Sequence, residues 1–205
     1  MKEQHHTYCG IILLAAGESS RLGRPKQLLV YKGLTLLQRM LSVAGESMAG
    51  PIVMVLGANA EMLQSQLEGN KARIFVNTNW EEGIGSSIRL GVSEIRKLDK
   101  DIDAVILMLC DQPFVHPVLL NNLIEAYEKT GKPIITCNYG ETFGPPTFFH
   151  KTMFPALLQL EGDVGARSIL KRHIDQVETI DFPEGDLDID TQEDYEVLIK
   201  MNSEE

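Results

Sequence analysis

Long hydrophobic runs are missing from this sequence. The longest apolar stretches, near 11–16 and 104–110, fall far short of the roughly 20 residues that a membrane-spanning helix needs. The first ten residues, MKEQHHTYCG, are polar and lack the apolar core of a secretory signal. We therefore expect a cytoplasmic protein that does not associate with a membrane.

Cysteine is scarce, and its spacing excludes two classes of site. Cys9, Cys110 and Cys137 are odd in number and far apart in the chain. This pattern is untypical of a disulfide scaffold, and no Cys or His stands at the spacing of metal ligands. Each cysteine lies in an apolar, strand-like segment, so we expect buried, reduced thiols.

Positive charge is also in short supply. Nineteen Lys and Arg residues face 29 Asp and Glu residues, which gives a formal net charge of −10. Such a balance argues against a protein that coats nucleic acid. A small anionic ligand would need a local island of positive charge, and the segment 21–26, with Arg21, Arg24 and Lys26, is the best candidate.

Apolar runs and helical patterns alternate along the chain. Runs typical of strands occur at 8–16, 51–57, 72–77, 103–110, 133–138, 144–149 and 176–182. Helical spacing occurs at 34–44, 62–67, 84–95, 119–127, 151–162, 165–173 and 191–199. The alternation predicts an α/β fold, with a mostly parallel sheet between helices, in a single domain over 1–205. Ligands of such sheets bind beyond the carboxyl ends of the strands.

The first of these strand ends is LLAAGESSRLGRPKQLL, residues 13–29. Gly17 permits close approach of a phosphate, Ser19 and Ser20 offer hydroxyl donors, and Arg21 and Lys26 supply charge. The segment matches neither the P-loop nor the dinucleotide-binding pattern. It is either a phosphate-binding loop or an exposed turn with solvated charges.

Carboxylates follow two other apolar runs. Asp111 ends the run at 103–110 and could hold Mg²⁺ through an oxygen, or simply cap the next turn. In DLDIDT, residues 186–191, Asp188 and Asp190 share one face if the segment is extended. Two negative charges so near each other favour a cation between them, so a metal site shared with Asp111 is one interpretation. A solvated turn before a helix is the other.

Two glycine-containing segments are further candidates. In NTNWEEGIGSSIRLG, residues 77–91, Gly83 precedes Ser86 and Ser87 at the start of a predicted helix. Such a helix start suits an anion or a nucleobase edge, although it would equally serve as a helix cap. The segment GDVGAR, residues 162–167, is either a substrate loop or a structured turn.

Together these segments resemble a known family. LAAGxSxRxGxxK, matched over 14–26, is similar to the signature of nucleotidyltransferases that activate small phosphorylated molecules with an NTP. NTNWEEGIGSSI, CDQPFV, GPPTFF, GDVGAR and DIDTQEDY then resemble the molybdenum cofactor cytidylyltransferases. The resemblance runs from about residue 10 to residue 198, with its motifs in order.

The resemblance implies a Rossmann-like three-layer α/β/α sandwich of the nucleotide-diphospho-sugar transferase type, with a mostly parallel sheet. It also implies Mg²⁺-dependent transfer of CMP from CTP to the phosphate of molybdenum-loaded molybdopterin, with release of pyrophosphate. Ala15 and Ala16 resemble the cytidylyl branch more than the guanylyl branch, and so favour CTP.

Several alternatives stay open. The chain could use GTP or a different phosphorylated acceptor with the same loop. It could also be a non-catalytic carrier of molybdenum cofactor for a molybdenum hydroxylase such as xanthine dehydrogenase, or a nucleotide sensor without turnover.

The family's roles can be carried over to this sequence. Catalysis would fall to Lys26, Arg21 and Asp111. Nucleotide binding would fall to Leu14, Ala15, Ala16, Gly17, Glu18, Ser19, Arg21, Lys26, Asn79, Ser86 and Ser87. The metal would lie on Asp111 with Asp188 or Asp190. The acceptor would contact Gln112, Pro146, Thr147, Phe148, Asp163, Gly165 and Arg167.

Overall fold

The described residues of the computed structural model, 6–67 and 69–203, form an α/β fold around a seven-stranded sheet. The strands lie in the order β5-β4-β1-β6-β8-β7-β9. Their bounds are β1 Cys9–Ala15, β4 Ile52–Leu56, β5 Arg73–Val76, β6 Ala104–Leu109, β7 Ile134–Asn138, β8 Phe143–His150 and β9 Val177–Asp181. All seven strands lie in segments where the apolar runs predict them.

The sheet is parallel except at β8, which pairs antiparallel with both β6 and β7. Only residues 139–142 separate β7 from β8. A link this short allows a hairpin but not the long crossover that parallel strands need. The expected mostly parallel sheet is therefore confirmed, with one reversed strand that the apolar pattern alone does not reveal.

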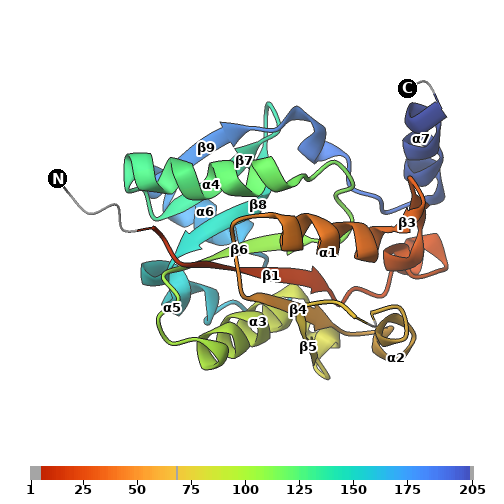
Figure 1. The fold of residues 1–205 in the computed structure, drawn as a ribbon, viewed down its shortest axis with the longest axis horizontal. Helices are drawn as coiled ribbons and strands as arrows, with labels where there is room; N and C mark the ends of the chain where they lie inside the picture. The colour runs from red at the N-terminus through yellow and green to blue at the C-terminus, as the bar shows by residue number, and fades with distance from the viewer. Residues whose placement is uncertain (1–5, 68, 204–205) are drawn as a thin grey trace.

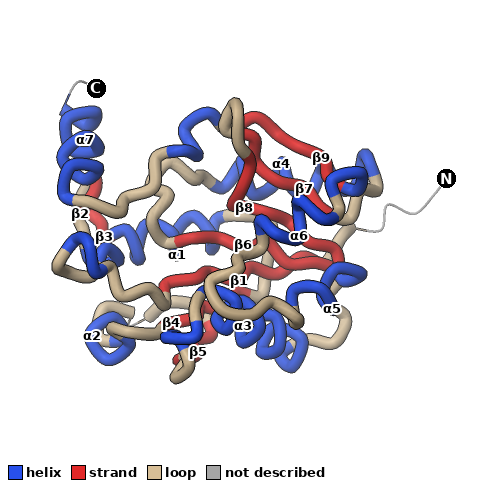
Figure 2. The backbone as a smooth tube through the Cα atoms, turned by 180° about the vertical axis from the view of Figure 1, so that it is seen from behind, coloured by secondary structure: helices blue, strands red, loops and turns tan. Residues whose placement is uncertain are grey.

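Helices cover both faces of the sheet, as Figures 1 and 2 show from opposite sides. Ile11 and Leu13 belong to one apolar cluster, and Ile12 and Leu14 to the other, because side chains alternate along a strand. The first cluster includes residues of α1 (Leu36–Glu46), α2 (Ala60–Gln64) and α4 (Pro117–Thr130). The second includes residues of α3 (Ile84–Leu98), α5 (Phe154–Leu157) and α6 (Arg167–Arg172). The three-layer sandwich is confirmed.

A small hairpin, β2 (Val30–Tyr31) with β3 (Leu34–Thr35), follows the 13–29 segment. Sequence periodicity places the start of a helix at 34, but α1 begins at Leu36 behind a capping box of Thr35 and Gln38. The last helix, α7 (Gln192–Ser203), stands beside this hairpin, and the arrow of β1 points toward them in Figure 1. The hydroxyl of Tyr195 joins the two by donating to the carbonyl of Val30 at 2.8 Å.

The structure confirms the expectation for the cysteines and shows how the last helix begins. Cys9, Cys110 and Cys137 are buried free thiols, and burial raises the pKa of all three. Thr191 and Asp194 exchange hydrogen bonds at the start of α7, in the manner of a capping box. Across the described residues, no helix combines the length and the apolar character required to cross a membrane.

Candidate active site

A pocket of about 580 Å³ lies beyond the carboxyl ends of β1 and β6. Its walls come from the loop after β1, the turn before α3 and the end of β6. The lining residues are Leu14, Ala15, Ala16, Gly17, Glu18, Ser20, Arg21, Lys26, Gln27, Trp80, Glu81, Gly83, Ile84, Ser87, Leu109, Cys110, Asp111 and Asp163. Three segments that are separate in sequence, 14–27, 80–87 and 109–111, thus meet where the sheet rule predicts a ligand.

The loop after β1 has a defined conformation. Ser19 has a φ of 61°, in the left-handed region, and its Oγ accepts a hydrogen bond from the backbone N–H of Lys26 at 3.0 Å. The carbonyls of Ala15 and Gly17 accept from the side-chain amide of Gln27. The loop after β1 is therefore a turn whose conformation is fixed by side-chain hydrogen bonds. Gln27, which sequence reasoning missed, supplies two of these bonds.

A cluster of opposite charges includes three residues that line this pocket, Arg21, Lys26 and Asp111. The Lys26 ammonium donates to Asp111, and it lies 2.8 Å from an oxygen of Asp190. Arg21 lies 2.6 Å from the other oxygen of Asp190. Burial alone would lower the pKa of Lys26, but the two carboxylates raise it above its usual value, so the side chain stays charged.

The third carboxylate of the predicted metal set lies close by. The pKa of Asp188 is raised to about 7, first by desolvation and then by the charge of Asp111. Part of the Asp188 side chain nevertheless stays exposed. Asp111 Oδ1 is buried and has no hydrogen-bond partner among the described residues. An unpartnered carboxylate oxygen near a second carboxyl of raised pKa is the kind of donor set that a divalent cation prefers. Among residues 6–67 and 69–203, no three His, Cys, Asp or Glu side chains are grouped so that they could hold a metal ion. The ammonium of Lys26 pairs with both Asp111 and Asp190.

The C-terminal segment contacts all three cations of the 21–26 island. Asp190 pairs with Arg21 and Lys26, while Arg24 donates to Gln192 at 3.1 Å and lies over the ring of Tyr195. The sequence predicts that these positive side chains bind a ligand. In the structure, they contact residues 190–195 of the chain itself.

The 77–87 segment is organised by Asn77, another residue that sequence reasoning missed. Its side-chain amide is buried and donates to the hydroxyls of Ser86 and Ser87 at 2.7 and 2.9 Å. Ser86 Oγ also donates to the backbone oxygens of Asn79 and Gly83, and neither Ser86 nor Asn79 lines the pocket. Ser87 does line it. Of these three candidates, the structure therefore brings only Ser87 to the pocket wall.

A second pocket, of about 330 Å³, adjoins the first. The two share Leu14, Ile84, Leu109 and Asp163. The second is further lined by Ile88, Leu107, Gln112, Tyr139, Gly144, Pro145, Thr147, Gly165, Ala166, Arg167, Leu170 and Asp188. It therefore gathers five of the seven predicted acceptor residues, together with Tyr139, whose hydroxyl accepts from Gln112 at 3.2 Å.

Two predicted acceptor residues do not line this pocket. Phe148 is fully buried on the opposite face of the sheet, where its ring stacks on Tyr127 of α4 with centroids 4.8 Å apart. Pro146 is buried too, and the neighbouring Pro145 and Thr147 line the pocket instead. Strand alternation is the physical reason for the placement of Phe148, because Thr147 and Phe148 must point to opposite faces. Of the seven predicted acceptor residues, Pro146 and Phe148 are therefore the two that the structure does not bring to this pocket.

The GDVGAR segment packs against the turn before α3. The backbone N–H of Gly85 donates to the carbonyl of Gly162 at 3.0 Å, and Arg89 donates to the carbonyl of Leu160. A Cβ on Gly83 would lie 2.5 Å from Asp163 Oδ1. The segment is therefore a structured turn whose side chains Asp163 and Arg167 reach the second pocket.

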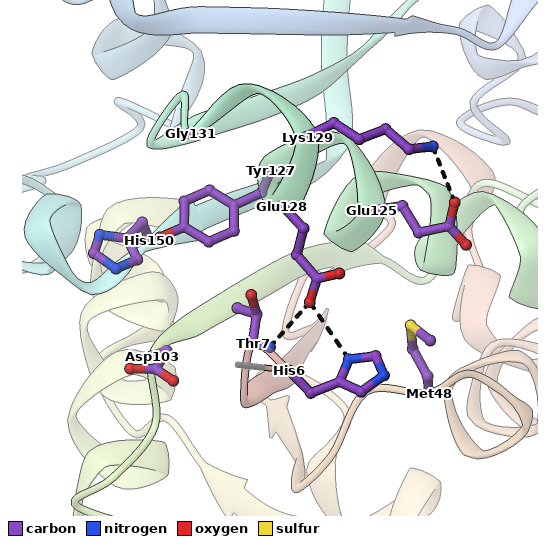
Figure 3. Close-up of a pocket in the computed structure, with 10 residues that line it drawn as sticks. All are labelled: His6, Thr7, Met48, Asp103, Glu125, Tyr127, Glu128, Lys129, Gly131 and His150. Atoms are coloured by element: carbon purple, nitrogen blue, oxygen red, sulfur yellow. Dashed lines mark hydrogen bonds and ion pairs between the residues drawn. The ribbon is translucent and has the colours of Figure 1, made fainter. Parts of the chain in front are cut away.

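A third hollow, of about 820 Å³, lies at the other end of the sheet (Figure 3). Its wall includes Thr7, just before β1, and His150, which pairs with the first residue of β6. Glu128 of α4 accepts from the backbone of Thr7 and pairs with His6. Asp103 and Glu125 add further negative charge. Three carboxylates outnumber Lys129 in the lining, so this hollow has the wrong charge for a polyphosphate. It lies at the amino ends of β1 and β6, away from the sites above.

Comparison with known proteins connects this geometry to a family. Residues 11–177 match the family described as "MobA-like NTP transferase domain". The "Nicotine blue oxidoreductase" of Paenarthrobacter nicotinovorans is 30% identical over 194 residues, covering 89% of this chain and 92% of the relative. The "Purine catabolism protein PucB" of Bacillus subtilis is 29% identical over 203 residues, covering 94% of this chain and 96% of the relative.

A solved structure agrees with the fold. Rv0371c from Mycobacterium tuberculosis superposes with a TM-score of 0.80 at 30% identity, over 95% of this chain and 98% of that one. A second structure of that protein is a complex with manganese.

Proposed function

The chain belongs to the MobA-like NTP transferase family and is a nucleotidyltransferase, and on that premise we propose that it transfers CMP from CTP to molybdopterin. The terminal phosphate of molybdopterin would attack the α-phosphorus of CTP, and the bond from that phosphorus to the β-phosphate oxygen would break. The products are molybdopterin cytosine dinucleotide and pyrophosphate.

The observation that carries this proposal is the pair of adjoining pockets, with Lys26 in the lining of the first. A transferase must hold two substrates in contact, and both of these are polyanions. In the first pocket, the loop after β1, Arg21 and Lys26 would contact the triphosphate. The second offers Gln112, Thr147 and Arg167 to the acceptor.

The residues around Lys26 supply most of the chemistry that we propose. No covalent intermediate is needed, because phosphoryl-type transfer depends on positioning and on neutralising charge. The ammonium of Lys26, whose side chain is largely but not fully buried, would lie between the α-phosphate and the incoming phosphate. Arg21, whose side chain is 68% exposed, would contact the β- and γ-phosphates.

Mg²⁺ is part of the proposal. Asp111 would hold it, with Asp188 or Asp190 as the second carboxylate. The orphaned oxygen of Asp111 and the raised pKa of Asp188 support this, as does the manganese complex of the M. tuberculosis relative. When bound, the ion would neutralise charge that develops on the phosphates.

Release of pyrophosphate tests the proposal directly. Purified protein is incubated with Mg²⁺ and molybdenum-loaded molybdopterin, separately with CTP, GTP, ATP and UTP. Release with CTP alone supports the proposal, and release with GTP alone overturns the choice of nucleotide while keeping the reaction type. Asp111→Asn should abolish most Mg²⁺-dependent release, and ordinary Mg²⁺ dependence in that variant would exclude Asp111 as a ligand.

A second candidate follows from the name of one relative. A protein 30% identical to this chain is called an oxidoreductase, so an oxidoreductase activity is the second candidate. Its test, with the same preparation, is the oxidation of NADH or NADPH in the presence of an added dye as the electron acceptor. If folded protein releases no pyrophosphate with any of the four nucleotides, the result favours a different acceptor first. The next alternative is a non-catalytic carrier for a molybdenum hydroxylase such as xanthine dehydrogenase.

A further inference from the structure

We propose that Gln27 is a positioning residue that holds the loop of residues 15–18 in its phosphate-binding conformation. The inference rests on the proposed function only in assuming that this loop receives the triphosphate. No sequence motif points to Gln27, because its role depends on what its side chain touches in the folded chain.

The contacts of Gln27 are specific. The residue is 1% exposed. Its Nε2 donates to the carbonyl of Ala15 at 3.1 Å and to the carbonyl of Gly17 at 3.0 Å. One side-chain amide therefore fixes two carbonyls of the loop, two residues apart.

Fixing these carbonyls decides where the loop's N–H groups point. In a planar trans peptide the C=O and the following N–H point in opposite directions. The N–H groups of Ala16 and Glu18 must therefore point away from Gln27. The carbonyl between them, that of Ala16, accepts from the backbone of Ala58 at 3.2 Å. Three successive peptide planes are held, and the N–H groups of Ala16 and Glu18 are both directed away from Gln27, where they can donate to an anion.

The other end of the amide shows why glutamine is present. Gln27 Oε1 is buried and accepts no hydrogen bond from the described residues. A buried acceptor without a partner destabilises a protein, so an apolar side chain of this shape would serve packing better. The amide is therefore explained by its two donated bonds and not by packing.

The same short turn also places the proposed catalytic cation. Lys26 and Gln27 are adjacent in a single 3-10 turn, and the N–H of Lys26 donates to Ser19 Oγ at 3.0 Å. Gln27 thus couples the position of the loop to the position of the ammonium. Loss of its donors should loosen the loop without removing any charge from the pocket.

The test compares two glutamine-to-methionine variants of the full chain. Gln27→Met keeps the shape and removes the donors. Gln38→Met is the matched control, because Gln38 belongs to the capping box of α1, away from the pockets. The probe is inorganic tripolyphosphate with Mg²⁺, measured by calorimetry. Amide hydrogen exchange of residues 16–18, kcat and KM for CTP are measured alongside.

We expect Gln27→Met to bind tripolyphosphate about tenfold to a hundredfold more weakly, with a matching rise in KM and faster exchange at 16–18. We expect Gln38→Met to lower the unfolding temperature but to keep the wild-type affinity. Wild-type affinity in Gln27→Met overturns the proposal. If the wild type itself binds no tripolyphosphate, the proposed function fails first.

A second variant covers the chance that Gln27→Met does not fold. Gln27→Glu keeps the shape, lacks the donors and adds a negative charge, so it should lose at least as much affinity. Slow exchange in the strands of the sheet shows that each variant is folded. If neither variant folds, Gln27 supports the whole domain and the positioning role is overturned.

Discussion

The ammonium of Lys26 lies 2.8 Å from Asp190, a residue 164 positions further along the chain. The family match ends at residue 177, so this contact joins the matched domain to the segment that follows it. The Lys26 side chain is 18% exposed and has carboxylates on two sides. A polyphosphate that reaches Lys26 must therefore compete with the chain's own anions, unless a cation takes over those carboxylates.

Replacing Lys26 tests this arrangement. Lys26→Ala should lower the rate of pyrophosphate release by roughly two to three decades, because a charged contact at the reacting phosphate is lost. Unfolding measured by circular dichroism should still show a folded protein. Lys132→Ala, distant in the fold, is the control and should keep its rate. Near-normal turnover in Lys26→Ala would remove this residue from the mechanism.

The pH dependence of stability should reveal Asp188. Its pKa is raised to about 7 in the folded chain, above the ordinary 3.8, so the folded state holds the proton more tightly than the unfolded state does. The free energy of unfolding of the metal-free protein should therefore fall as pH rises from about 4 to 7. Asp188→Asn should remove this loss and be the more stable protein at pH 8. Because Asp188 is partly exposed, solvent screening limits the difference to about 1 kcal/mol.

The measurement is denaturant unfolding at several pH values, without added metal. Asp186→Asn, an exposed neighbour in the same segment, serves as the control and should follow the wild type. Parallel pH profiles for wild type and Asp188→Asn would show that Asp188 does not titrate in this range.

Much of this architecture was predictable, for a physical reason. The buried runs of β1 and β6 are recognisable because both faces of these strands are covered, which demands an unbroken apolar sequence. The carboxyl-end rule then places Lys26, Asp111 and Ser87 near one another. These are local patterns joined by one general rule of topology.

The parts that could not be predicted depend on single side chains in three dimensions. Alternation places Phe148 away from the pocket and Thr147 in it, but the face is fixed only once β8 is paired. Gln27 acts through hydrogen bonds to a loop, and Asn77 acts through hydrogen bonds to the first turn of α3. Such bonds leave no periodic pattern in a sequence. Asp190 reaches Lys26 only because the C-terminal segment returns to the pocket.

The position of Phe148 outside the second pocket can be tested by substitution. Phe148→Leu should lower the free energy of unfolding by roughly 1–3 kcal/mol, because the stack on Tyr127 and part of the core packing are lost. KM for the acceptor should stay within about twofold of the wild type, since the side chain faces the other side of the sheet. Arg167→Ala should show the reverse, with a raised KM and little change in stability. A raised acceptor KM in Phe148→Leu at full stability would return Phe148 to the acceptor site.

Gly83 joins the two loops that separate the pockets. Its φ is +112°, and a Cβ would lie 2.5 Å from Asp163 Oδ1 and from the carbonyl oxygen of Gly162. Gly83→Ala should therefore push the two loops apart and destabilise the protein by about 1–3 kcal/mol. KM should rise for nucleotide and acceptor together, because Asp163 lines both pockets. Thermal unfolding and steady-state kinetics measure both effects.

Gly45→Ala is the matched control, because Gly45 lies inside α1 with open space where its Cβ would stand. Alanine is the better helix former there and should stabilise the protein by up to about 1 kcal/mol, with kinetics unchanged. If Gly83→Ala altered KM for one substrate only, the two pockets would not depend on a common wall. If it altered neither, the contact between residues 83 and 162–163 would be a packing detail without bearing on binding.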